Sequence, residues 1–400
     1  MKRLLSILIT INLLFTPACG TGADNHPENV GITYAASDIE GHLPSSLEFS
    51  ELERTIDRFF LKNENRVAAF SVAVFTAKNL VLEKAYGYSG GAPPNFDKND
   101  SGTVFDWGSI TKVLVWVSVM QLYERGLLDL HEDIRVYLPE GFMPMSKYRD
   151  PITMLNLMNH RTGLAPFTYG GLIDAAADDF DFGEFLRKNM PEQEFHPGTV
   201  SRYQSFNGAL AGYIVECISG GPFYEYVHKN IFAALGMTRT ALKPGFSDNH
   251  FVQERYSRLV SFNNGRPPAP VGGRLWSIPI YPGGQAAGTL SDMRKLAQAL
   301  LPDENGKSIL FEKSETLTKM YSPSHIGDPI GANVIRHGFM DSRFGTPGRG
   351  MPPFGHSGVT TGGVAWLLID IENNVGVVFM SNVIDERLFS SEIPRLIFGG

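Results

Sequence analysis

Apolar residues gather in short runs near both ends of the folded part of this 400-residue chain. Near the beginning, residues 70–75 and 80–86 form two such runs, and the Lys78-Asn79 dipeptide between them predicts a tight turn between two strands. Residues 363–369 and 375–380 repeat the arrangement near the end, with a polar Glu-Asn-Asn turn at 372–374. The pattern therefore predicts one strand pair at each end of the chain.

Between these strand pairs, apolar residues recur mostly at helical spacing. Residues 110–126 are apolar over most of their surface and predict a buried helix. Further helices are predicted over residues 52–61, 154–159, 182–189, 208–218 and 224–235, and over residues 291–301 with Ser291 as the cap. This is an α+β pattern. Its simplest architecture is one antiparallel sheet built from the N- and C-terminal segments and flanked by helices, with a mainly helical region inserted over roughly residues 109–260.

Charge and composition narrow the class of protein. Acidic residues outnumber basic ones by 42 to 35, a formal net charge of −7, whereas a nucleic-acid binder should carry a basic patch. Two cysteines, Cys19 and Cys217, are too few for a disulfide framework, and no His-Glu-x-x-His or Cys/His spacing indicates a metal site. Cys217 falls in a predicted apolar helix and is expected to be a buried thiol. We therefore expect no nucleic-acid partner, no metal and no cofactor.

The N-terminal segment predicts export. Lys2 and Arg3 precede an apolar stretch over residues 4–15 that is too short for a membrane-spanning helix, which needs about 20 residues. The following Thr-Pro-Ala-Cys-Gly, at 16–20, resembles the bacterial lipobox, in which the cysteine becomes lipidated. We therefore expect a signal peptide at 1–18, a lipid anchor on Cys19 in a bacterial membrane of the cell envelope, a flexible tether at 19–50 and one domain at 51–400. An ordinary cleaved signal, with Cys19 incidental, is the alternative.

Ser109 and Lys112 form a Ser-x-x-Lys motif directly before the predicted buried helix. Residues three apart at a helix start share one face, so the lysine amine should lie near the serine hydroxyl. A serine hydroxyl needs a nearby base or cation to become a nucleophile. The positive end of the helix dipole favours a neutral lysine and negative charge developing on the serine. The motif thus predicts a nucleophile and its activator, with a capping serine and a surface lysine as the alternative.

Two further segments are candidate parts of the same site. Tyr203 lies at a loop–helix junction within residues 197–205, where it can serve as a base if cations lower its pKa from about 10. Packing beneath the loop is the alternative for this tyrosine. Residues 355–359, Gly-His-Ser-Gly-Val, precede the predicted strand at 363–369. Gly358 would let a substrate approach the backbone, and the Val359 N–H could pair with that of Ser109 as an oxyanion hole.

The three segments, in this order, resemble the serine β-lactamase and penicillin-binding-protein superfamily, especially its class C-like branch of esterases, peptidases and β-lactamases. Residues 103–112, 119–130, 155–164 and 288–293 also look like blocks of this family, so the likeness covers roughly residues 52–382. It implies a β-lactamase/transpeptidase-like fold. Relatives usually close with a longer helix than the 18 residues after Asn382 allow, so a further C-terminal segment is expected.

The resemblance also implies a chemistry. It makes Ser109 the acylated nucleophile, Lys112 its activator and Tyr203 the general base and acid, with Gly358 and Val359 on the substrate-binding strand. The protein would then be an exported serine hydrolase that forms an acyl-serine intermediate. Its small-molecule or peptide substrates would be esters, D-amino-acid peptides or β-lactam-like amides.

Two substrate-binding positions depart from the family pattern. His356 stands where many relatives have the Lys of Lys-Thr-Gly, and if its protonated form assists, activity should change between about pH 5.5 and 7.5. Ser205 stands where the esterase-like branch usually has Asn, and a hydroxyl lacks the separate donors and acceptor of a carboxamide. Its contacts with a substrate amide or with Lys112 are therefore in question, with Gln204 or Asn207 as substitutes. Together the departures favour esters or small peptides over β-lactams.

Several alternatives remain open in the sequence. Residues 87–91, Gly-Tyr-Ser-Gly-Gly, match the nucleophile elbow of α/β-hydrolases, but two prolines follow where that elbow needs a helix. A catalytically weak penicillin-binding or sensor module of the cell envelope is favoured by Ser205, and sustained ester turnover would exclude it. A purely structural envelope protein would have no use for an intact Ser-x-x-Lys motif. His160, within the block at 155–164, is expected to be structural.

Overall fold

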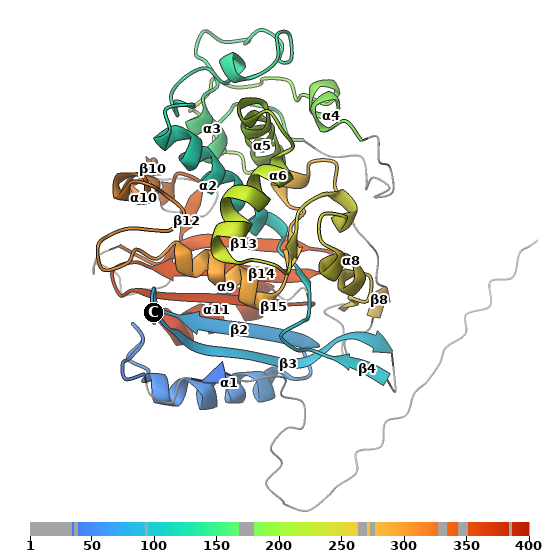
Figure 1. Cartoon of the computed structure of the whole chain (residues 1–400), viewed down its shortest axis with the longest axis vertical. Helices are drawn as coiled ribbons and strands as arrows, with labels where there is room; N and C mark the ends of the chain where they lie inside the picture. Colours follow the sequence, from blue (N-terminus) through green and yellow to red (C-terminus); the bar gives the residue numbers. More distant parts are fainter. Residues whose placement is uncertain are drawn as a thin grey trace, which may run out of the picture.

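The computed structural model describes residues 34–35, 39–92, 95–167, 180–262, 270–272, 277–326, 334–342, 351–383 and 386–399. A large antiparallel sheet crosses the molecule in the order β1-β3-β2-β15-β14-β13-β12-β11-β10, with β4 paired to β3 (Figure 1). Its strands are β1 (Tyr34–Ala35), β2 (Ala69–Phe75), β3 (Leu80–Ala92), β4 (Asn95–Lys98), β10 (His325–Ile326), β11 (Val334–Arg336), β12 (Phe339–Asp341), β13 (Phe354–Thr360), β14 (Gly363–Asp370) and β15 (Val375–Ser381).

Helices cover both faces of this sheet. The central strand β2 alternates its side chains between the faces, as a pleated strand must. Val72 and Val74 pack with α1 (Phe49–Asn63) and α11 (Glu386–Phe398) on one face. Ala73 and Phe75 belong to the larger core on the other face, where α9 (Leu290–Ala299) contacts β2, β14 and β15. Because β15 pairs with β2, the sheet joins the N- and C-terminal parts of the chain.

The remaining helices gather on the α9 side of the sheet, above it in Figure 1. They are α2 (Thr111–Glu124), α3 (Met154–Met158), α4 (Phe182–Lys188), α5 (Ser205–Ser219), α6 (Phe223–Val227), α7 (Ala233–Leu235), α8 (His250–Tyr256) and α10 (Ser314–Tyr321), with a π-helical turn at His228–Phe232 and 3-10 turns at Gly108–Ile110, Ile134–Tyr137, Pro244–Phe246 and Tyr281–Gly283. Two small sheets complete the fold: β5 (Phe105–Asp106), β9 (Ala287–Gly288) and β6 (Thr240–Ala241) in one, β7 (Ser261–Phe262) and β8 (Pro270–Gly272) in the other.

The helix α2 forms the centre of the larger core. Every residue of α2 except Tyr123 is buried. An α-helix that is apolar around its whole circumference must be surrounded by other elements, and α2 contacts α5, α6 and α10 as well as the 3-10 turn before it. The Ser-x-x-Lys motif therefore lies at the start of a helix that is packed on nearly every side.

The predicted α+β architecture is confirmed, with local corrections. The two predicted strand pairs are β2–β3 and β14–β15, both antiparallel. The segment around His356 does not precede a strand but is itself strand β13, paired with β14. Helix α9 is capped by Thr289, whose side chain accepts from the Asp292 N–H, and not by Ser291. Helices α8, α10 and α11 were not expected from the pattern.

Part of the predicted domain organisation lies outside the described residues. This applies to the signal peptide at 1–18, to Cys19 and to most of the tether at 19–50. Within the residues that are described, no helix is both long enough and apolar enough to cross a bilayer.

Candidate active site

Ser109 and Lys112 face each other at the start of α2. Ser109 lies in the 3-10 turn Gly108–Ile110, and Lys112 follows in the first turn of the α-helix. The Lys112 ammonium nitrogen is 3.0 Å from the Ser109 hydroxyl oxygen. The alternative of a capping serine beside a surface lysine does not hold for Lys112, because its side chain is completely buried.

The surroundings of Lys112 hold its amine in one place. Its nitrogen donates to the Gly283 carbonyl at 2.5 Å and lies 3.1 Å from the Ser205 hydroxyl. Gly208 on α5 packs against the aliphatic stem so closely that a Cβ there would lie 3.0 Å from the lysine Cγ. Burial lowers the pKa of Lys112 from 10.5 to about 7, because an ammonium loses its hydration there. A neutral amine is therefore accessible near neutral pH.

Tyr203 approaches the same pair from the segment before α5. Its ring centroid lies 5.1 Å from the Lys112 nitrogen. Its hydroxyl is buried and has no hydrogen-bond partner among the described residues. Burial raises the pKa of Tyr203 above its usual value of 10, while the nearby Ser109 hydroxyl opposes the rise. Tyr203 is therefore a protonated, neutral phenol in the resting site. In this form it can donate a proton, whereas the base role expected from the sequence requires a lowered pKa.

Ser205 keeps a contact that the sequence left in question. Its hydroxyl lies within hydrogen-bond distance of the Lys112 nitrogen, as given above, so the shorter side chain still reaches the amine. Gln204 and Asn207 do not take over this place. The Gln204 carboxamide oxygen accepts from the Phe167 N–H, and the Asn207 amide nitrogen lies 3.1 Å from the His160 ring.

Strand β13 runs directly past the Ser109 turn. A Cβ at Gly358 would lie 2.0 Å from the Trp107 carbonyl oxygen and 3.1 Å from the Ser109 nitrogen. Conversely, a Cβ at Gly108 would lie 3.0 Å from the Val359 nitrogen, and the φ of +52° at Gly108 also favours glycine. The two glycines let the backbones touch. The Ser109 and Val359 nitrogens thus lie on neighbouring segments, as a two-amide oxyanion hole requires.

His356 lies beside Tyr203, with ring centroids 6.1 Å apart. Its Nδ1 lies 2.6 Å from the Ser357 carbonyl oxygen, which can only accept, so Nδ1 carries the proton and Nε2 carries a lone pair. Burial, and then the charge of nearby Lys112, lower the pKa of His356 to about 3. The ring is neutral at physiological pH, which revises the expectation of a protonated His356.

His160 was expected to be a structural residue of a turn, and it also borders the site. Its Nδ1 accepts from the Asn207 amide at 3.1 Å, and its ring lies 4.3 Å from the Tyr203 ring. Its backbone has φ of +54°, and its carbonyl accepts from the Arg202 N–H, directly before Tyr203. His160 thus positions the tyrosine from both backbone and side chain. The family block at 155–164 was the signal in the sequence that could have pointed to it.

Asp106 is a positioning residue that the sequence did not single out, although it lies within the family-like block at 103–112. It lies three residues before Ser109, and its carboxylate accepts from the Tyr256 hydroxyl at 2.6 Å and from the Thr360 hydroxyl at 2.8 Å. Thr360 follows Val359 on β13. Burial raises the pKa of Asp106, and the two hydroxyl donors lower it in part. The carboxylate therefore ties the segment before Ser109 to strand β13, which carries the Val359 amide.

We expect Asp106→Asn to lower kcat for an activated ester by about 10- to 100-fold, because a misplaced oxyanion amide weakens transition-state binding. Asparagine has only one side-chain oxygen, and its NH₂ group stands where the second carboxylate oxygen accepted a hydrogen bond from a hydroxyl. Steady-state kinetics on p-nitrophenyl acetate measure kcat and KM separately. Tyr256→Phe is the matched control, since it removes one of the two bonds and leaves the tie to Thr360, so its kcat should fall less. Full activity in Asp106→Asn would contradict the positioning role.

The competing serine match lacks the strand–serine–helix arrangement of a nucleophile elbow. Residues 87–91 lie within the long strand β3, which pairs with β4 where an elbow would need a helix. Among the residues that the structure describes, no group of three or more His, Cys, Asp or Glu side chains could hold a metal ion. Within the described residues, the Ser-x-x-Lys motif is thus the serine match that lies beside a buried amine and a phenol.

Comparisons with known proteins find relatives of this chain and of its fold. The family model described as Beta-lactamase matches residues 50–392. The chain is 25% identical over 358 residues to Penicillin-binding protein 4 of Amycolatopsis lactamdurans, across 85% of this chain and 87% of that protein. The D-amino acid amidase of Ochrobactrum anthropi superposes with a TM-score of 0.63 at 23% identity, covering 84% of this chain and 92% of that one. The hydrolase EstCE1 gives 0.67 at 17% identity, with coverages of 88% and 99%. The two structural likenesses show a shared fold.

Proposed function

Because the chain belongs to the Beta-lactamase family, we propose that it is a serine hydrolase that works through an acyl-enzyme on Ser109. The observation that carries this proposal is the buried amine of Lys112, held 3.0 Å from the Ser109 hydroxyl with a lowered pKa. A structural protein gains nothing from burying a lysine beside a serine, since desolvation of the ammonium is costly.

Lys112 is the group that takes the proton of Ser109. A neutral amine has two N–H donors and one lone pair. The Gly283 carbonyl can only accept, and the Ser205 hydroxyl can accept the second N–H. The lone pair is then left for the Ser109 O–H. The serine oxygen attacks the substrate carbonyl carbon as its proton moves to Lys112, and the carbonyl oxygen becomes an oxyanion facing the Ser109 and Val359 amides.

Tyr203 completes the proton transfer. Its phenol gives its proton to the departing oxygen or nitrogen of the substrate as the carbonyl carbon releases that group, and Lys112 returns the proton of Ser109 to the phenolate. In the second half, water gives a proton to the Tyr203 oxygen as the phenol passes its own proton to the neutral Lys112 amine, and the water oxygen attacks the acyl carbon. The bond from that carbon to the Ser109 oxygen then breaks, the serine oxygen takes a proton back from Lys112, and the acid product leaves. Its raised pKa suits Tyr203 as the donor.

The acidity of Lys112 sets the expected pH dependence. We expect kcat/KM to rise with pH through an inflection near 7, since the neutral amine is the active form. The neutral His356 should contribute no inflection of its own between pH 5 and 9. A pH profile of His356→Gln should therefore keep the wild-type inflection, whatever its absolute rate. If His356→Gln lost the inflection, His356 and not Lys112 would be the group whose titration controls kcat/KM.

The substrate class is proposed from the site and from relatives. Esters, D-amino-acid peptides and β-lactam-like amides all present a carbonyl to Ser109, and the structural neighbours include a D-amino acid amidase and the hydrolase EstCE1. A neutral His356 offers no positive charge to a substrate carboxylate, which favours esters or small uncharged peptides over β-lactams. Purified protein should be assayed against one substrate of each kind, with Ser109→Ala as the control in every assay.

The same screen tests the alternative of a catalytically weak penicillin-binding or sensor module. Stoichiometric acylation by a penicillin without steady-state product from any substrate would favour that module. Sustained turnover of a p-nitrophenyl ester, lost in Ser109→Ala, would exclude it. The contact that Ser205 keeps with Lys112 supports the enzyme over the module.

Export and membrane attachment are part of the proposal. The N-terminal pattern supports a signal peptide at 1–18 and lipidation of Cys19 in a bacterial membrane. Growth of expressing cells with a clickable palmitate analogue, followed by membrane fractionation, tests this. A Cys19→Ala variant that keeps the label and the membrane location would overturn the lipid anchor.

A further inference from the structure

Of the three reacting side chains, that of Tyr203 comes from a segment without regular secondary structure, since α5 begins at Ser205. The Tyr203 hydroxyl has no hydrogen-bond partner among the described residues. The position of its ring therefore depends on how the backbone before it is held. That backbone, residues 194–203, is called the tyrosine segment below.

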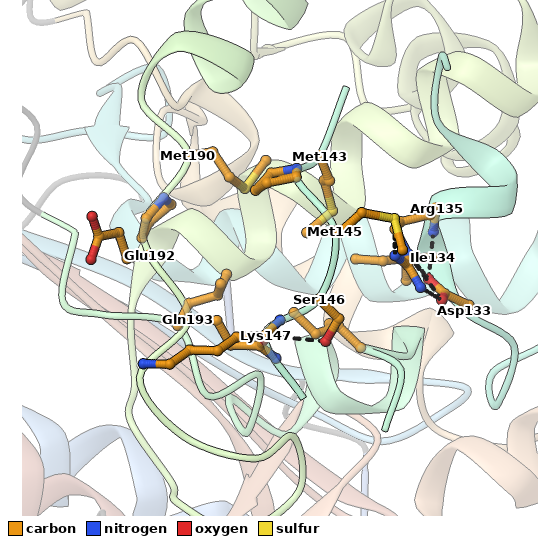
Figure 2. Close-up of a pocket in the computed structure, with 14 residues that line it drawn as sticks. Asp133, Ile134, Arg135, Met143, Met145, Ser146, Lys147, Met190, Glu192 and Gln193 are labelled. Carbon is orange, nitrogen blue, oxygen red and sulfur yellow. Dashed lines mark hydrogen bonds and ion pairs between the residues drawn. The ribbon is translucent and has the colours of Figure 1, made fainter. Parts of the chain in front are cut away.

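The tyrosine segment is fixed at its beginning. The Glu194 N–H donates to the Gly163 carbonyl oxygen at 2.8 Å. Gln193, directly before the segment, accepts with its carboxamide oxygen from the Ser146 hydroxyl at 3.0 Å and from the Lys147 N–H at 2.9 Å (Figure 2). The chain thus enters the segment from a fixed point.

Arg161 holds the turn in the middle of the segment. Its guanidinium Nε lies 2.9 Å from the Gly198 carbonyl oxygen, and its Nη2 lies 2.7 Å from the same oxygen and 2.9 Å from the Thr199 carbonyl oxygen. The Gly198 N–H donates in return to the Arg161 carbonyl oxygen at 2.7 Å. A guanidinium presents its N–H groups as a rigid planar fork, so one side chain can bind two successive carbonyls.

The turn held by Arg161 leads directly to Tyr203. Thr199 is four residues before Tyr203 in the chain. Between them, the Arg202 N–H donates to the His160 carbonyl oxygen at 2.8 Å. Because His160 and Arg161 are consecutive, one short stretch of backbone fixes the tyrosine segment at two points just before the ring.

Loss of the Arg161 side chain should therefore act on one reacting group and spare the other two. The carbonyls at the turn would lose their donors, and the backbone before Tyr203 could shift. Ser109 and Lys112 belong to the packed start of α2 and make no contact with the turn at 196–199 among the described hydrogen bonds.

We propose that Arg161 is a positioning residue for Tyr203, and that it thereby determines whether the site can expel poor leaving groups such as alkoxides and amines. The inference rests on the proposed function, in which Tyr203 is the proton donor. An alkoxide or an amine needs a proton from the phenol as its bond to the carbonyl carbon breaks. A p-nitrophenolate instead leaves with the bonding electron pair as a stable anion, and the proton that Lys112 took from Ser109 passes to the solvent.

The second half of the reaction needs Tyr203 for every ester, because the phenol passes the proton of the attacking water to Lys112. A displaced Tyr203 should thus slow two steps. The first is formation of the acyl-enzyme from substrates with poor leaving groups, and the second is hydrolysis of the acyl-enzyme from any substrate.

The test compares p-nitrophenyl acetate with benzyl acetate, two esters with the same acyl group. For Arg161→Met, kcat/KM should fall at least about tenfold with benzyl acetate and stay within about threefold with p-nitrophenyl acetate. With p-nitrophenyl acetate, kcat and KM should fall together, and a burst of p-nitrophenolate should precede the steady state, because the acyl-enzyme accumulates. A general loss of folded protein would lower both esters equally and would produce no burst.

Two further variants complete the experiment. Arg161→Lys keeps the charge and one nitrogen, so it should show the same split with smaller losses, and it provides the comparison if melting curves show that Arg161→Met is unfolded. Arg54→Met is the matched control, since it removes an arginine that donates to Glu51 at 3.1 Å on α1, on the opposite face of the sheet. Its rates on both esters should stay within about twofold of wild type.

The outcomes separate this role from the proposed function. Equal losses on both esters without a burst, or wild-type rates on both in the Arg161 variants, would overturn the role of Arg161 and leave the hydrolase in place. Absence of turnover of both esters by the wild-type protein would overturn the proposed function, and this inference with it.

Discussion

Replacing Ser109 by alanine should lower kcat/KM for a p-nitrophenyl ester by at least about 10⁴-fold, while the melting temperature changes by no more than a few degrees. The size of the loss follows from the covalent step: without the serine oxygen no acyl-enzyme forms, and the remaining oxyanion amides accelerate only the attack of water. Ser109 is only partly buried, and the Lys112 amine keeps its contacts with the Gly283 carbonyl and the Ser205 hydroxyl, so the loss of the Ser109 hydroxyl leaves that amine with partners.

Ser89→Ala is the matched control for that experiment. Ser89 is the central serine of the competing Gly-x-Ser-x-Gly match and lies in strand β3. Its replacement should leave kcat/KM within about twofold, since a single exchange away from the reacting groups has a small effect. If Ser89→Ala were the inactive variant and Ser109→Ala the active one, the assignment of the nucleophile would be contradicted.

Replacing Lys112 by methionine should lower kcat by about 10³- to 10⁴-fold, because the amine is the proposed acceptor of the serine proton. Methionine keeps most of the length and the apolar stem that packs on Gly208, so the cavity is filled. Steady-state and single-turnover assays measure the loss. Lys229→Met, which removes an exposed lysine in the π-helical turn His228–Phe232, is the control and should keep full activity.

The same variant should also change how stability depends on pH. The pKa of Lys112 is about 7 in the folded protein and 10.5 in the unfolded chain, so the unfolded state binds more protons between these values. Stability contributed by this group therefore rises with pH from about 7 to 10.5, and below pH 7 the full cost of burying the ammonium applies. The difference in unfolding free energy between wild type and Lys112→Met should shift in favour of wild type by several kcal/mol across that window. Denaturant titrations at pH 6, 8 and 10 measure it, and a constant difference would contradict a buried, depressed amine.

Local spacing was enough to predict that the Ser109 and Lys112 side chains meet, and to predict the two strand pairs. Ser109 and Lys112 are three residues apart, and a helix start brings such residues together whatever the rest of the fold does. The strand pairs β2–β3 and β14–β15 are joined by short turns, so their pairing is also local. The family likeness then supplied Tyr203, whose approach to Lys112 spans 91 residues and has no local cause.

Other features depend on contacts that no local pattern carries. Asp106 acts through Thr360, which lies 254 residues further along the chain, and an acidic residue before an apolar helix has no distinctive spacing. Strand β13 contains Gly355 and Gly358, which weaken the strand signal although close backbone contacts require both. The short helices α8 and α10 are polar on one side and gain their stability from packing. Cys217 is half-buried beside Tyr213 and not fully buried as its apolar helix suggested.

The convergence of Ser109, Lys112 and Tyr203 is tested most directly by mapping a covalent adduct. The wild-type protein should be treated with a fluorophosphonate at pH 8, digested, and analysed by tandem mass spectrometry. One phosphonyl group per chain on Ser109, with labelling that slows as the pH falls below about 7 and that is abolished in Lys112→Met, is the expected result. An adduct on any other residue, or labelling of Lys112→Met at the wild-type rate, would contradict a serine activated by its buried neighbour.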